Sequence, residues 1–166
     1  MHSSTVLKFA LITGLAMTGA PAAQAADYVA IVKQVEVDRP ADLVWQRVGD
    51  YCAIADWMKT DCGYLSGTGG VGTVRRILKG TVTEVMVAQT SRSYTYWQTQ
   101  GNMAGAAYHG TLAAESVGPS RTRLTYTLFY DQAALASDAD RRAQHERLDG
   151  RFQGFLAAMK EIAERR

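Results

Sequence analysis

Glu84 is the side chain of this sequence with the clearest potential for acid–base chemistry, because its predicted strand is apolar on both faces. Alternation along the strand puts Glu84 on one face with Val82 and Met86. A buried carboxylate must be either paired with a cation or protonated. Arg75, on the preceding predicted strand, is the natural partner across a hairpin turn at Gly80. Two readings stay open: an ion pair that shapes the sheet, which we favour, and a catalytic acid or base.

His109 is the only histidine on a predicted strand and the second candidate for proton transfer. Its neighbour Tyr108 points to the opposite face, so at most one of the two lines a shared cavity. As a general base, His109 needs a carboxylate partner, for which the sequence offers Glu84 or Glu115. A lone histidine is more often structural, and both roles stay open.

Tyrosines recur on the predicted strands and could orient a ligand through their hydroxyl groups. The set comprises Tyr94, Tyr96, Tyr108, Tyr126 and Tyr130. Alternation places Tyr126 and Tyr130 on the face shared by Leu124 and Leu128, which should meet a helix. Phenol groups suit a mostly apolar pocket with a few directed hydrogen bonds, but they equally suit core filling with the hydroxyl near water.

The two cysteines, Cys52 and Cys62, stand ten residues apart and could close a small loop by a disulfide. Spacing does not reveal side-chain geometry, so two buried thiols are the alternative. Neither His109 nor His145 stands at metal-ligand spacing from a cysteine. We therefore expect neither a metal nor another cofactor.

The elements that must position these residues follow from periodicity and turn residues. A first strand is predicted at 28–38, a helix starting at Pro40 and a second short helix through 54–58. An antiparallel meander follows, with strands at 73–79, 81–88, 93–100, 106–117 and 121–131.

A long amphipathic helix is predicted at 137–166, capped by Ser137 or Asp138. Gly150 and Gly154 are poor helix formers within it. Their presence suggests space for something close to the helix, either a ligand or a crossing strand.

The N-terminus has the three parts of a secretory signal peptide: Lys8, an apolar run from 9 to 19, and a small-x-small cleavage pattern before Ala26. We expect residues 1–25 to be removed and residues 26–166 to form one soluble domain, periplasmic or secreted, without a stable membrane anchor. Loss of Lys8 leaves 17 basic against 16 acidic side chains, a net charge of +1. This balance argues against a nucleic-acid partner.

Several stretches also carry a family resemblance. They are Arg39-Pro40-Ala41-Asp42-Leu43-Val44-Trp45, Gly49-Asp50-Tyr51 through to Trp57, Gly70-Val71-Gly72-Thr73-Val74-Arg75, Gly80 with Glu84, and Tyr108 with Leu112. With this element order, the chain resembles the START-related polyketide cyclase/dehydrase and lipid-transport superfamily, which includes birch-pollen-allergen-like proteins. The resemblance implies an α+β helix-grip fold, in which a curved antiparallel sheet of about six or seven strands wraps a long C-terminal helix, with two short helices after the first strand.

The resemblance further implies an apolar cavity between sheet and helix that receives a lipid, polyketide, steroid or other small hydrophobic molecule. Our preferred hypothesis is an exported carrier or sensor of such a molecule. The alternatives are a cyclase or dehydratase-like enzyme using Glu84, His109 or a tyrosine, and an accessory protein that docks on a periplasmic partner. The residues predicted to contact the ligand are Trp57, Arg75, Glu84, Tyr96, Tyr108, Tyr126, Tyr130 and Gly154.

Overall fold

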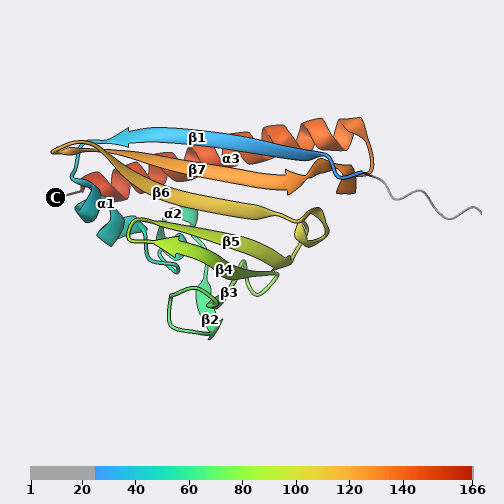
Figure 1. The fold of residues 1–166 in the computed structure, drawn as a ribbon, viewed down its shortest axis with the longest axis horizontal. Helices are drawn as coiled ribbons and strands as arrows, with labels where there is room; N and C mark the ends of the chain where they lie inside the picture. The colour runs from blue at the N-terminus through green and yellow to red at the C-terminus, as the bar shows by residue number, and fades with distance from the viewer. Residues whose placement is uncertain (1–24, 166) are drawn as a thin grey trace, which may run out of the picture.

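A seven-stranded antiparallel sheet and one long helix dominate the computed structural model, which describes residues 25–165 (Figure 1). The strands are β1 (Tyr28–Val37), β2 (Cys62–Ser66), β3 (Val74–Ile77), β4 (Val82–Thr90), β5 (Ser93–Gln100), β6 (His109–Gly118) and β7 (Arg121–Asp131). The helices are α1 (Ala41–Val48), α2 (Ile54–Met58) and α3 (Asp138–Glu164), with short 3₁₀ turns η1 (Ala104–Ala106) and η2 (Gln132–Ala134).

The sheet is an open antiparallel meander to which β1 adds an edge strand beside β7, with the order β1-β7-β6-β5-β4-β3-β2. The turn at residues 118–120 joins β6 to β7, whose pairing extends to Gly118 opposite Arg121. The β3–β4 turn contains Gly80, but Leu78 and Lys79 also adopt positive φ there. Arg75 and Glu84 stand directly opposite each other across this hairpin, as the sequence predicted.

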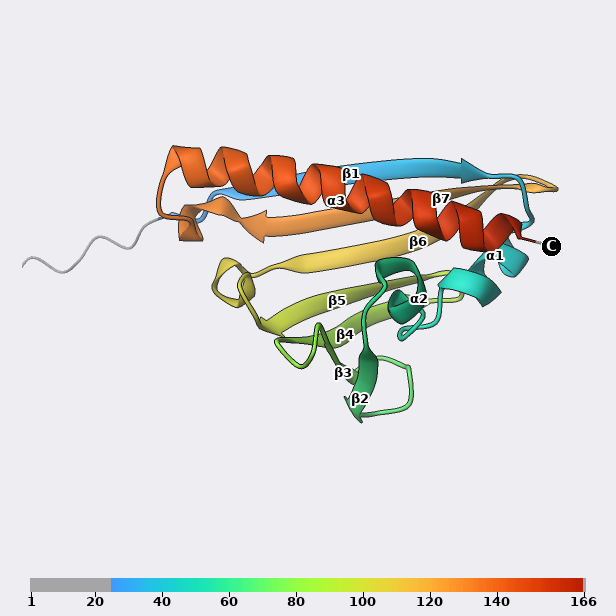
Figure 2. The same ribbon diagram turned by 180° about the vertical axis from the view of Figure 1, so that it is seen from behind.

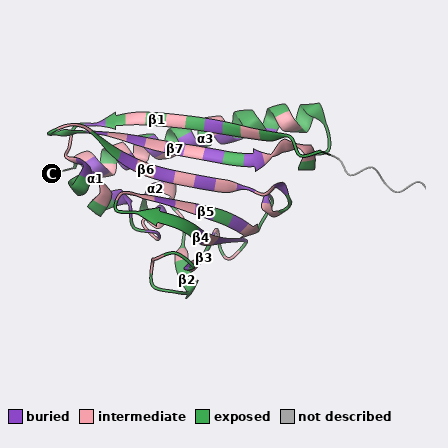
Figure 3. Ribbon diagram, in the orientation of Figure 1, coloured by how far each residue is buried: buried purple, intermediate pink, exposed green. Residues whose placement is uncertain are grey.

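Ser137 caps the N-terminus of α3: its hydroxyl accepts a hydrogen bond from the Asp140 backbone N–H at 3.2 Å. It runs along β1 and β7 on one face of the sheet (Figure 2). Its apolar stripe, which includes Phe152, Leu156 and Met159, is buried against that face. Burial therefore alternates along the strands, with β7 the most regular case (Figure 3).

The helix-grip architecture expected from the sequence is confirmed, but one strand was not predicted and several boundaries differ. Strand β2 was not predicted, because Cys62–Ser66 is an edge strand with no buried face and so lacks an alternating pattern. The predicted strand at 106–117 begins only at His109, since η1 occupies 104–106.

The interpretation of Gly150 and Gly154 was wrong in both of its forms. Both glycines are exposed on α3, and a Cβ added at either position would meet no atom within 4 Å. Neither a ligand space nor a crossing strand lies beside them.

Within residues 25–165, no helix is long and apolar enough to cross a membrane. The predicted signal peptide, except for Ala25, lies outside the described residues.

Candidate functional site

A cavity lies between α3, α2 and the sheet, and has a volume of about 60 Å³. Its walls are mainly apolar and aromatic, with a small number of polar groups. The residues that line it are Ile54, Trp57, Met58, Ile77, Leu78, Val82, Glu84, Tyr96, Gln98, Asn102, Met103, Tyr108, Tyr126, Gln144, Arg147, Leu148, Arg151, Phe152 and Phe155. This composition is typical of a small-molecule site.

Aromatic contacts connect the three walls of the cavity. Trp57 of α2 meets Phe155 of α3 with ring centroids 5.5 Å apart. Tyr126 of β7 lies edge-on to Phe152 at 4.6 Å and to Trp57 at 6.2 Å. The tilted and edge-to-face arrangements fill the space between helix and sheet.

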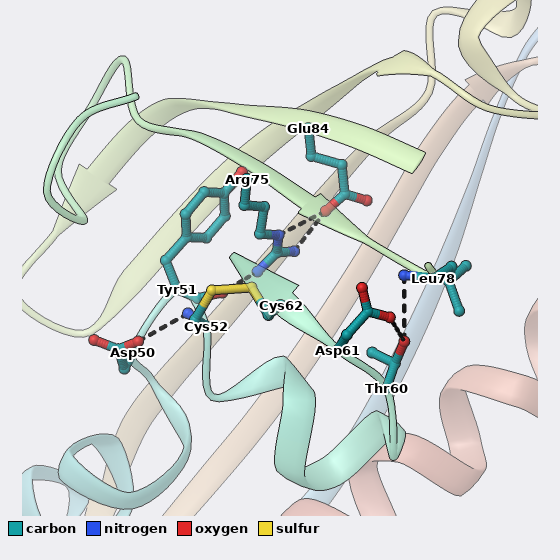
Figure 4. The surroundings of a disulfide bond; sticks show 9 residues. All are labelled: Asp50, Tyr51, Cys52, Thr60, Asp61, Cys62, Arg75, Leu78 and Glu84. Atoms are coloured by element: carbon teal, nitrogen blue, oxygen red, sulfur yellow. Dashed lines mark hydrogen bonds and ion pairs between the residues drawn. A yellow bond between two sulfur atoms is a disulfide. The ribbon is translucent and has the colours of Figure 1, made fainter. Parts of the chain in front are cut away.

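Glu84 lines the cavity. Its carboxylate is paired with Arg75 of the neighbouring strand (Figure 4). Glu84 Oε2 accepts a hydrogen bond from Arg75 Nε at 2.8 Å and forms an ion pair with the guanidinium, whose Nη2 lies 2.7 Å away. Arg75 is fully buried, its Nη1 donates to the Tyr51 carbonyl, and its guanidinium lies 3.9 Å from the centroid of the Tyr51 ring. Burial alone would lower the pKa of Arg75, but the carboxylate of Glu84 and the neighbouring tyrosines together outweigh this, and the pKa rises. The predicted ion pair is therefore present and fully desolvated.

The tyrosine hydroxyls of the cavity remain neutral at ordinary pH. Burial raises the pKa values of Tyr96, Tyr108 and Tyr126 above the usual phenol value. Tyr126 Oη donates to Tyr96 Oη at 3.1 Å, which links β7 to β5 across the cavity floor. These phenols can orient a ligand or donate a proton, but they do not supply a phenolate.

His109 lies on the outer face of the sheet, away from the cavity, so its candidacy as a catalytic base was wrong. Its ring is stacked on Trp97 at 6.2 Å, and its Nδ1 is 2.7 Å from the Ala107 carbonyl oxygen. Tyr108 takes the inward position, as the alternation of side chains requires.

The disulfide Cys52–Cys62 encloses α2, which contributes Trp57 and Met58 to the cavity (Figure 4). The two Cα atoms are 5.6 Å apart. Beside the bridge, the Lys79 backbone N–H donates to Asp61 Oδ1 at 2.7 Å, and this bond lowers the pKa of Asp61. Helix α2 is thus fastened to β2 and to the β3–β4 turn.

Five of the eight predicted ligand contacts line the cavity: Trp57, Glu84, Tyr96, Tyr108 and Tyr126. Arg75 and Tyr130 are buried outside its lining, and Gly154 faces solvent. Sequence reasoning missed several lining residues of the helix and of the β5–β6 connection, namely Asn102, Met103, Gln144, Arg147 and Arg151. No group of three or more metal-ligating side chains occurs in the part of the chain that the structure describes.

Residues 28–164 match the family model described as polyketide cyclase/dehydrase and lipid transport. The chain belongs to this family. No curated protein matches it at a significant level.

The Zhui aromatase/cyclase from Streptomyces sp. R1128 is one solved structure with the polyketide cyclase/dehydrase fold seen here. It is 22% identical, with a TM-score of 0.70, and the match covers 84% of this chain and 96% of that one. A point mutant of norcoclaurine synthase from Thalictrum flavum, in complex with a transition-state analogue, is 16% identical with a TM-score of 0.64. That match covers 85% of this chain and 97% of the synthase. At these identities the likeness establishes the fold.

Proposed function

We propose that this family member binds a small hydrophobic molecule in the cavity between α3 and the sheet, and that it does so outside the cytoplasm. The observation that carries the proposal is the cavity itself, whose aromatic walls enclose a few oriented polar groups. The family match to a polyketide cyclase/dehydrase and lipid-transport model supports a ligand of this kind. A lipid, a polyketide and a steroid-like molecule all fit this chemistry.

The cavity must enlarge to accept such a molecule. Its volume is about 60 Å³. Pockets that bind small molecules usually have volumes of about 300 to 1,000 Å³. Met58, Leu78 and Phe155 are only partly buried along its wall. We expect these side chains to turn outward on binding, so that α2 and the β3–β4 turn separate from α3.

Replacing Met58 by tryptophan should block the cavity and weaken binding of the neutral fluorophore N-phenyl-1-naphthylamine about tenfold. The larger ring would occupy the space that the probe needs. Fluorescence titration measures the affinity, and Val87→Trp is the matched control because Val87 is 41% exposed and outside the cavity lining. Equal affinities for wild type and Met58→Trp would overturn the proposed site.

A cyclase or dehydratase-like enzyme is the second candidate function, because Glu84 and neutral phenols share one cavity. The buried ion pair of Arg75 with Glu84 Oε2, which includes a hydrogen bond from Arg75 Nε, favours a structural role for this carboxylate. Mass analysis of a molecule that co-purifies from the host separates the two functions. Return of the same mass after incubation supports binding, whereas an altered mass supports the enzyme.

Export is the other part of the proposal, and it is supported by the three-part N-terminus. N-terminal sequencing of the protein from the periplasmic fraction should begin at Ala26 or within a residue or two of it. Recovery of a form that still begins at Met1 would contradict export.

A further inference from the structure

Two arginines of α3 stand side by side in the cavity lining. Arg147 and Arg151 are four residues apart, which places them on the same side of the helix, one turn from each other. Both side chains are exposed, so they mark where the cavity meets solvent. Arg147 Nη2 donates to Gln144 Oε1, and Gln144 Nε2 in turn lies 3.1 Å from Met103 Sδ. This chain of contacts holds one guanidinium at the edge of the cavity.

The two arginines have no acidic partner within residues 25–165. Several other charged side chains of α3 and its C-cap do pair: Asp149 with Lys33, Arg141 with Asp138, Lys160 with Glu164 and Arg165 with Glu161. The only acidic residue of the cavity lining is Glu84, which Arg75 already neutralises. The cavity therefore opens through an edge with an uncompensated charge of two guanidinium groups.

The positive charge of the two arginines also acts on the Tyr108 hydroxyl in the cavity lining. Burial raises the pKa of the Tyr108 hydroxyl, while the charges of Arg151 and Arg147 act in the opposite direction. An anionic group placed near the Tyr108 hydroxyl would be stabilised by the same two charges. A guanidinium also presents its N–H donors in a geometry that matches a carboxylate.

We propose that the molecule bound in this cavity is an amphipathic carboxylate, whose apolar part lies between the aromatic walls and whose carboxylate is held by Arg147 and Arg151. The inference rests on the proposed binding function and specifies its ligand class. The aromatic rings of Trp57, Phe152 and Phe155 favour a flat apolar part.

The test compares 2-naphthoate with its neutral methyl ester by isothermal titration calorimetry at low salt. Wild type should bind the carboxylate about tenfold more tightly than the ester, because charge-assisted hydrogen bonds add to the apolar contacts. The double variant Arg147→Gln/Arg151→Gln should lose this preference and bind the ester as wild type does. Added salt should weaken naphthoate binding and leave ester binding unchanged.

Arg142→Gln is the matched control, because Arg142 is an exposed arginine of the same helix outside the cavity lining. It should keep the full preference, and Arg147→Lys/Arg151→Lys should keep part of it. Equal binding of acid and ester by wild type would overturn the carboxylate inference and leave the binding function intact. Failure of wild type to bind either compound would overturn both. Unchanged preference in the double glutamine variant would overturn the assignment of the two arginines.

Discussion

Replacing Arg75 by methionine should lower the free energy of unfolding by about 3 to 5 kcal/mol. The substitution leaves Glu84 without its cation at a position where the carboxylate is only 4% exposed. It also removes the donor to the Tyr51 carbonyl, which joins β3 to the segment that leads into the disulfide loop. Urea denaturation followed by circular dichroism measures the loss.

The double variant Arg75→Met/Glu84→Leu is the informative comparison. Because both charges are removed and apolar volume is retained, its stability should return most of the way to wild type. The exposed pair Arg92–Asp42, with side chains 36% and 82% exposed, supplies the control. Asp42→Asn should change the free energy of unfolding by less than about 1 kcal/mol. A double variant as unstable as Arg75→Met would show that packing, and not the unpaired carboxylate, causes the loss.

Much of this fold could be predicted because alternation and hairpin turns constrain antiparallel strands strongly. A shift of one residue in β7 would move Tyr126 and Tyr130 from the core to solvent, so their burial follows from the pattern. The pairing of β3 with β4 that places Arg75 directly opposite Glu84 could be predicted from the turn at Gly80. Edge strand β2 escaped prediction because neither of its faces is buried.

The direction in which each α3 side chain points relative to the buried stripe could also be predicted from helix geometry. Gly154 follows Phe152 by two residues, about 200° around a helix of 3.6 residues per turn, so it must point away from the buried stripe. Arg147 and Arg151 each precede a stripe residue by one, about 100° away, which is the flank where a cavity reaches solvent. The sequence could not show which flank faces the cavity, since that depends on how α3 lies across β1 and β7.

Removing the disulfide by Cys52→Ser/Cys62→Ser should lower the free energy of unfolding by about 2.5 to 3 kcal/mol, because an unbridged chain gains entropy when it unfolds. The fold should persist, since the core of sheet and α3 does not include the bridge. Urea denaturation of the variant without reductant should match that of wild type with reductant. A midpoint equal to that of oxidised wild type would contradict this expectation.

The same variant should also bind N-phenyl-1-naphthylamine more weakly, because the bridge encloses the helix that supplies Trp57 and Met58 to the cavity. With the bridge absent, α2 keeps the packing of Trp57 against Phe155 and Tyr126 but loses its covalent link to β2. The side chains of Trp57 and Met58 would then sample more positions. Binding would have to restrict them, and this loss of entropy would lower the affinity. Asp61→Asn, with the bridge intact, is the control, because it weakens one polar link and leaves the loop closed. If the double serine variant loses stability but keeps its affinity for the probe, α2 is positioned by its contacts with Phe155 and Tyr126, and the disulfide stabilises the protein without shaping the cavity.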